Sequence, residues 1–126
     1  AARPALPATP FAELIGRAVA DLAVRDGGGT VSVGNLAEFD SIAADSGRLP
    51  SLVYGSVPDS VPNGTVLAIA VNGRIGAVAP VVAPDRGGRR FGALVEQESF
   101  FVPGRNRLEI FAVDEGPVLR RLTVRG

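Results

Sequence analysis

The stretch from Thr65 to Val78 reads TVLAIAVNGRIGAV and has the pattern of two short β-strands joined by a tight turn. At its centre stand Asn72 and Gly73, the pair that a two-residue type I′ turn prefers because both central residues need a positive φ. The flanking residues are mostly the β-branched and other apolar types found in strands. The stretch therefore predicts an antiparallel hairpin and an all-β fold around it.

Both faces of this hairpin are apolar, which is unusual for a small domain. In an uninterrupted register, Ala70 lies opposite Ile75 and Ala68 lies opposite Ala77. The large-residue face would carry Leu67, Ile69, Val71 and Val78, and the thin face would carry Ala68, Ala70, Ile75 and Ala77. We expect the first face to line the interior. We expect the thin face to be an interface, because such small side chains let a neighbouring helix or domain approach closely.

The rest of the chain continues this pattern, with short apolar runs separated by Gly, Pro, Asn and Asp. The predicted strands are Thr30–Val33, Leu52–Val57, Val66–Val71, Arg74–Ala79, Phe91–Val95, Arg107–Val113 and Leu119–Arg125. Seven short strands separated by turn signals are typical of an immunoglobulin-like antiparallel β-sandwich. Cys and Trp are absent, so we do not expect an antibody-type domain.

The first 29 residues differ from the rest in composition. Residues 1–10, AARPALPATP, are mostly Ala and Pro and predict an extended linker or arm. Residues 11–29 predict a short N-terminal helix and a Gly-rich connection, which leaves residues 30–126 for the sandwich. The apolar residues Phe11, Leu14, Ile15, Ala18, Val19 and Leu22 recur at helical spacing. The alternative is an extended segment that leads into the first strand.

Composition excludes several classes of function. The chain has 126 residues, enough for one domain, and its 13 basic residues balance 13 acidic ones. This balance disfavours a nucleic-acid partner. The chain contains no Cys, His or Lys, so it cannot build a thiolate metal site, a Ser-His triad or a Ser-Lys dyad. We therefore expect no cofactor and no catalysis by this chain alone.

Two features bear on the context of the chain. Position 1 is not Met, which indicates a processed chain or, as we expect, a fragment of a longer protein. Its partner would then be a preceding domain of the same parent chain. No apolar run approaches the ~20 residues that a membrane helix needs, so we expect no membrane insertion by this segment.

The loop at residues 85–90, DRGGRR, is the clearest candidate for contacting a ligand. It brings Arg86, Arg89 and Arg90 together with two Gly residues. Arginine is suited to phosphate, sulfate and carboxylate groups, so these residues could contact an anion or a glycan. The loop does not match a phosphate-binding loop, because the strand, GxxxxGK and helix context is missing. The simpler explanation is a solvated hairpin tip.

Two further features admit a functional interpretation. Glu96 and Glu98 would share a face of a strand, as paired carboxylates can in glycosidases. Two solvated charges at a strand end are the simpler explanation. Tyr54 is the only Tyr and Trp is absent, so the sequence offers a poor platform for stacking sugar rings or bases.

Four segments together resemble one family. They are FAELIGRAVADL, DSGRLPSLVYGSV, NGTVLAIAVNGRIGAVAPV and RRFGALVEQESFFVPGRNRLEIFAV, and they cover most of residues 11–124. They resemble the C-terminal region of actinobacterial membrane-anchored sulfatase-like proteins of the alkaline phosphatase superfamily. Many bacterial immunoglobulin-like modules carry a pattern similar to that of the VNGRI and PGRN motifs.

The resemblance implies a β-sandwich that follows an extracytoplasmic catalytic domain in the bacterial cell envelope. The family's metal ligands and nucleophile belong to that catalytic domain, and no stretch here matches them. The expected function is a non-catalytic accessory domain that packs on a neighbouring catalytic domain or contacts envelope glycan. The alternative is a free-standing immunoglobulin-like module that binds carbohydrate or protein.

Overall fold

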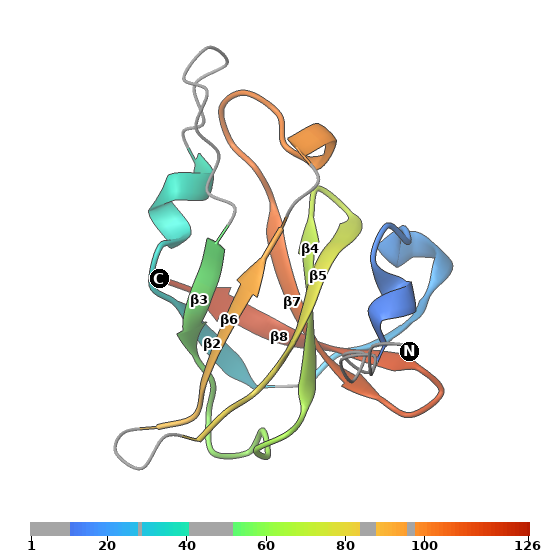
Figure 1. Cartoon of the computed structure of the whole chain (residues 1–126), viewed down its shortest axis with the longest axis vertical. Coiled ribbons are helices and arrows are strands. Elements are labelled where there is room, and N and C mark those ends of the chain that lie inside the picture. Colours follow the sequence, from blue (N-terminus) through green and yellow to red (C-terminus); the bar gives the residue numbers. More distant parts are fainter. Residues whose placement is uncertain (1–10, 28, 41–51, 84–87, 96–97) are drawn as a thin grey trace, which may run out of the picture.

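The computed structural model describes residues 11–27, 29–40, 52–83, 88–95 and 98–126, which form an all-β fold (Figure 1). The strands are β1 Ala23–Arg25, β2 Thr30–Val33, β3 Leu52–Ser56, β4 Val66–Val71, β5 Arg74–Pro80, β6 Arg90–Leu94, β7 Leu108–Asp114 and β8 Val118–Arg125. The short 3-10 helices are η1 Ala12–Leu14, η2 Val19–Asp21, η3 Leu36–Asp40 and η4 Glu98–Phe100. The predicted all-β class is confirmed, and each of the seven predicted strands is present with boundaries that agree within one residue.

The strands form one hydrogen-bonded path in the order β5-β4-β7-β8-β2-β3-β6, with β1 also paired to β8. Both β1 and β2 run parallel to β8, so the sheet is mixed and the prediction of a purely antiparallel one is wrong. The N-terminal strands follow β8 in the same direction, which a hairpin pattern does not reveal. A bridge between Val82 and Arg90 joins the two ends of the path, so the sheet curls until it is nearly closed, like a barrel.

The apolar residues divide into two clusters on opposite sides of β4 and β7. The larger cluster fills the interior of the curled sheet, and its largest fully buried side chains include Phe39, Leu67, Ile69 and Ile110. The smaller cluster lies on the other side of these strands, under the N-terminal segment, and includes Leu14, Ile75, Phe111 and Leu119. Alternating residues of β4 and β7 serve the two clusters, which explains why both faces of the central hairpin are apolar.

The prediction of a helix over residues 11–22 is wrong. This segment forms η1 and η2, separated by Gly16, whose φ of 92° lies in the left-handed region. Besides the short-range hydrogen bonds within its two turns, the backbone of the segment bonds to β5 and to the turn before it. The N–H of Gly16 donates to the carbonyl oxygen of Ile75 (2.7 Å), and the N–H of Val19 donates to that of Gly73 (2.8 Å). The segment lies away from β3 and β6 (Figure 1).

The predicted register of the β4–β5 hairpin holds only near the turn. Ala70 pairs with Ile75, but a β-bulge at Gly76 then places Ala77 opposite Ile69 and Val78 opposite Ala68. The bulge exchanges the faces of the two residues that follow it, because side chains alternate along a strand. Ala77 therefore belongs to the interior cluster, and Val78 packs against the smaller cluster. The expected placement of Ala77 on the thin face is wrong.

Candidate functional site

The thin face of the hairpin is covered by the chain itself. Ala68, Ala70 and Ile75 are completely buried. Leu14 and Val19 of the N-terminal segment belong to the same cluster. An outside partner that used this face as an interface would have to displace residues 11–22.

The three candidate arginines have different surroundings. Arg86 lies outside the described residues. Arg89 is engaged by the turn before β4, because its Nη1 donates to the carbonyl oxygen of Asp59 (3.0 Å) and lies 3.2 Å from Asp59 Oδ1. Arg90 is the first residue of β6, and its side chain is exposed.

Strand pairing places Arg90 at one end of a row of four polar residues. Ser56 of β3 pairs with Arg90, Ser32 of β2 pairs with Ser56, and Arg125 of β8 pairs with Ser32. The adjacent residues on these strands point into the interior cluster, so all four side chains point away from the interior. Nε of Arg125 donates a hydrogen bond to Oγ of Ser32 over 3.4 Å. The fold thus aligns two arginines and two hydroxyls from four separate strands.

Beside this row, Tyr54 forms the wall of a shallow hollow. The hollow has a volume of about 400 Å³ and is lined in part by Ser32, Ser56, Tyr54 and Arg90. Two glycines flank Tyr54, Gly34 in the lining of the hollow and Gly92 as the strand partner of Tyr54 on β6. A Cβ at Gly34 would meet Cε2 of Tyr54 at 2.4 Å, whereas a Cβ at Gly92 would meet nothing within 4 Å. The ring of Tyr54 thus lies close over Gly34, and the position across from it on β6 is open.

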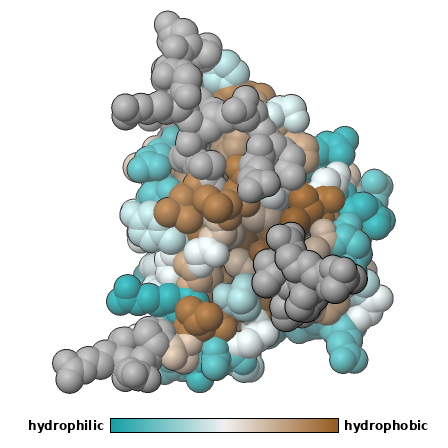
Figure 2. Space-filling model, in the orientation of Figure 1, coloured by the Kyte–Doolittle hydropathy of each residue, from teal (hydrophilic) through white to brown (hydrophobic). Residues whose placement is uncertain are grey.

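An apolar pair continues the same face beyond Tyr54. Leu52 of β3 pairs with Leu94 of β6, and the exposed fractions are 46% for Leu52, 59% for Leu94 and 46% for Tyr54. Figure 2 shows hydrophobic side chains exposed on the face that carries β3 and β6. We call the surface formed by the outward residues of β2, β3 and β6, together with Arg125, the outer face. It combines a basic polar row, an aromatic ring and an apolar end.

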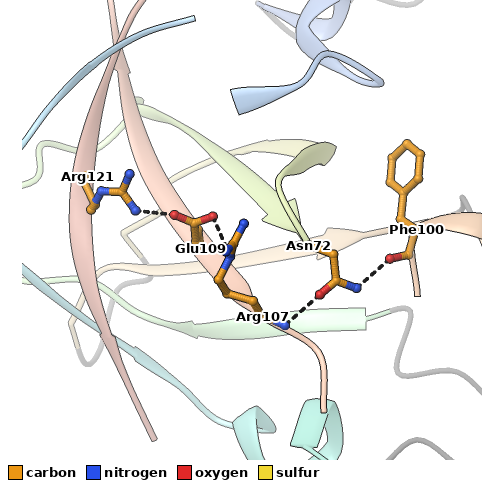
Figure 3. Close-up of polar contacts among 5 residues, drawn as sticks. All are labelled: Asn72, Phe100, Arg107, Glu109 and Arg121. Atoms are coloured by element: carbon orange, nitrogen blue, oxygen red, sulfur yellow. Dashed lines mark hydrogen bonds and ion pairs between the residues drawn. The ribbon is translucent and has the colours of Figure 1, made fainter. Parts of the chain in front are cut away.

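A second polar system links Glu109 of β7 to the β4–β5 turn (Figure 3). Glu109 accepts a hydrogen bond from Arg121, and its Oε1 lies 3.2 Å from Nε of Arg107. The N–H of Arg107 donates to Oδ1 of Asn72 (2.9 Å), and Nδ2 of Asn72 donates to the carbonyl oxygen of Phe100 (2.7 Å). These groups satisfy one another, so the system ties the β4–β5 turn to the chain before β7.

The remaining candidates can be placed only in part. Glu96 and the side chain of Glu98 lie outside the described residues. Within the described ranges, no cluster of three or more acidic side chains could hold a metal ion. In the same ranges, no helix has the length and apolarity needed to cross a bilayer.

Comparisons with protein-family models, with curated proteins and with solved structures return no match.

The sequence alone does not predict that the residues of the outer face are neighbours. Ser32, Ser56 and Arg125 come from three strands that are far apart in the chain, and only the strand order makes them neighbours. The alternation of polar and apolar residues along each strand predicts which side chains point outward, so it identifies part of this face. As the only Tyr of a chain without Trp, Tyr54 predicts a poor stacking platform, whereas the structure sets it beside Arg90 in one hollow.

Proposed function

We propose that this chain is a non-catalytic accessory domain that recognises a ligand on its outer face, within a larger bacterial cell-envelope protein resembling sulfatases. The observation that carries the proposal is the grouping of Tyr54, Leu52 and Leu94, each about half exposed, beside a hollow that Arg90 also lines. Exposed apolar groups that gather on one surface and are bordered by polar ones are typical of interaction sites. The proposed setting is extracytoplasmic.

We further propose an immunoglobulin-like sandwich as the detailed fold. Two strand groups support it, β2-β3-β6 and β5-β4-β7-β8. In chain order these match strands A, B and E of one immunoglobulin sheet and C′, C, F and G of the other. The interior cluster lies between the two groups, as the core of a sandwich does.

A second candidate function is packing on a neighbouring catalytic domain of the parent. Leu52 and Leu94 favour it, because apolar side chains in adjacent strands suit a dry protein contact. The polar row and the hollow favour a hydrated ligand instead, since two arginines and two hydroxyls would need partners in a buried contact. We therefore place ligand recognition first. A free-standing binding module would use the same face.

Co-sedimentation with cell-envelope material tests the proposal. The purified chain is mixed with protein-free polysaccharide sacculi from an actinobacterium, and the pelleted fraction is measured. We expect Tyr54→Ala to weaken binding about fivefold or more, as removal of a stacking ring does. Ile15→Ala, which removes an exposed apolar side chain from the N-terminal segment, is the matched control and should not weaken it.

Two outcomes would contradict the proposal. One is the absence of sedimentation with protein-free sacculi, and the other is an equal loss in both variants. If the chain instead sediments only with sacculi that retain their proteins, and Leu94→Ser abolishes this, packing on a protein replaces glycan recognition.

A further inference from the structure

We infer that the outer face binds an acidic saccharide, with Arg90 and Arg125 holding its anionic groups and Tyr54 packing against a sugar ring. This inference rests on the proposed function and names the ligand chemistry of the same face. It assigns Ser32 and Ser56 to the hydroxyl groups of the saccharide between the two arginines.

Charge is the first argument. The ion pairs among the described residues use Arg89, Arg107, Arg120 and Arg121. Within that part of the chain, Arg90 and Arg125 form no ion pair. A guanidinium group forms strong paired hydrogen bonds with a carboxylate or a sulfate. The two arginines of the row are therefore suited to anionic groups of a ligand.

Spacing is the second argument. Arg90 and Arg125 are separated by two strands, so their Cα atoms lie three strand spacings apart, or roughly 14 Å. Flexible side chains at both ends can adjust this distance. The row therefore suits an extended ligand with repeated charges, such as a short chain of acidic sugars, better than a single small anion.

The polar surface between the two arginines is the third argument. Ser32 and Ser56 occupy paired positions on β2 and β3, and each hydroxyl can both donate and accept a hydrogen bond. Sugar hydroxyls need partners of this dual kind. Tyr54 adds an amphipathic ring, and the open surface at Gly92 leaves room for a sugar beside it.

A nucleic acid fits these features less well. The formal net charge is zero, whereas binding to a phosphate backbone depends on many cations. Single-stranded nucleic acids also need several exposed aromatic rings for successive bases, and Tyr54 is the only aromatic residue classed as exposed among the described residues. A neutral glycan would leave Arg90 and Arg125 without anionic partners. The acidic saccharide is the ligand that uses every group of the row.

Titration followed by tyrosine fluorescence tests this inference directly. Because Tyr54 is the only Tyr and Trp is absent, tyrosine emission reports on this site alone. The probe is an oligogalacturonate, compared with a neutral malto-oligosaccharide of equal length and with an oligothymidylate. We expect saturable quenching by the oligogalacturonate, and binding at least tenfold weaker for the neutral sugar and for the oligonucleotide.

Charge-neutralising variants locate the contact. Arg90→Gln and Arg125→Gln should each weaken oligogalacturonate binding about tenfold, the size expected for a lost charged hydrogen bond. Arg17→Gln is the matched control, since Arg17 is exposed on the N-terminal segment and its loss changes the net charge equally. It should leave binding unchanged. All three variants should melt at the temperature of the unaltered chain, because the side chains of Arg17, Arg90 and Arg125 are exposed.

The inference is overturned by equal binding of the neutral sugar, by tighter binding of the oligonucleotide, or by equal losses in Arg17→Gln and Arg90→Gln. Its failure is distinguishable from failure of the proposed function. If the chain still sediments with sacculi in a manner that depends on Tyr54, ligand recognition stands and only the acidic saccharide is wrong.

Discussion

The side-chain amide of Asn72 donates a hydrogen bond to Oδ1 of Asn106, and the two atoms lie 2.8 Å apart. Asn72 has a φ of 52°, as the β4–β5 turn requires. Asn106 is only 3% exposed and lies in the chain before β7. Its Oδ1 also accepts from the N–H of Val102, and its Nδ2 donates to the carbonyl oxygens of Val102 and Gly104. The asparagines of the VNG and PGRN motifs therefore form one structural unit.

Replacing Asn106 with Ala should destabilise the fold by about 3 kcal/mol, because it leaves several buried polar groups without partners. Asn63→Ala is the control, since Asn63 is exposed, and should change stability by less than ~0.5 kcal/mol. Urea denaturation of both variants measures the free energy of unfolding. Similar values for the two would show that the Asn72–Asn106 contact contributes little.

The strands could be predicted from the sequence because they are local features. Turn residues and β-branched runs mark them, and the Asn72-Gly73 turn follows from a backbone requirement of φ. Two features depended on contacts between distant residues. The bulge at Gly76 reversed the faces of Ala77 and Val78. The N-terminal segment has apolar residues near helical spacing, yet it forms two short 3-10 helices whose connection bonds to the β4–β5 hairpin, instead of one continuous helix.

The candidate site was predictable only in part, for the same reason. Arg90 was identified from its own loop, but its neighbours Ser32, Ser56 and Arg125 come from other strands. A row across a sheet depends on strand order and register, and neither is written in any single stretch of sequence. Of the three arginines suggested by the DRGGRR loop, Arg89 is engaged with Asp59.

Gly55 tests how closely β2 approaches β3. A Cβ at this position would lie 1.8 Å from the carbonyl oxygen of Ser32, so Gly55→Ala would force the two strands apart. We expect a loss of about 3 kcal/mol or more, at the upper end of the cost of overpacking. Gly92→Ala is the matched control, since it adds the same methyl group to β6 where nothing lies within 4 Å.

For Gly92→Ala we expect a change within ~0.5 kcal/mol, with stabilisation favoured because Ala restricts the unfolded chain. Thermal unfolding followed by circular dichroism compares the two variants. Equal melting temperatures would mean that β2 and β3 are not as close at Gly55 as the structure shows.

Leu14 tests whether the N-terminal segment is part of the folded unit. It is 1% exposed and lies in the cluster that contains the thin face of the hairpin. Leu14→Ala should cost about 2–5 kcal/mol, the range for a buried leucine. The adjacent Ile15 is 38% exposed, so Ile15→Ala should cost less than ~1 kcal/mol. Chemical denaturation of both variants measures the difference.

Deleting residues 1–22 extends this test, because it uncovers Ala68, Ala70 and Ile75. The shortened chain should be less stable, or it should dimerise through the uncovered apolar surface. Light scattering combined with thermal unfolding detects both results. A monomer with an unchanged melting temperature would show that the segment does not stabilise the fold.

Ile69 provides the most severe test of the interior. It is completely buried in β4, between β5 and β7, and belongs to the larger cluster. Ile69→Asp would place an unpaired carboxylate there, at a cost of several kcal/mol, against a stability of ~5–15 kcal/mol for a typical domain. We expect a chain that is unfolded, with collapsed dispersion in its amide NMR spectrum. Thr123→Asp introduces the same carboxylate at an exposed position of β8 and should retain the dispersed spectrum. A dispersed spectrum and a cooperative melt for Ile69→Asp would mean that this face of β4 does not line the interior.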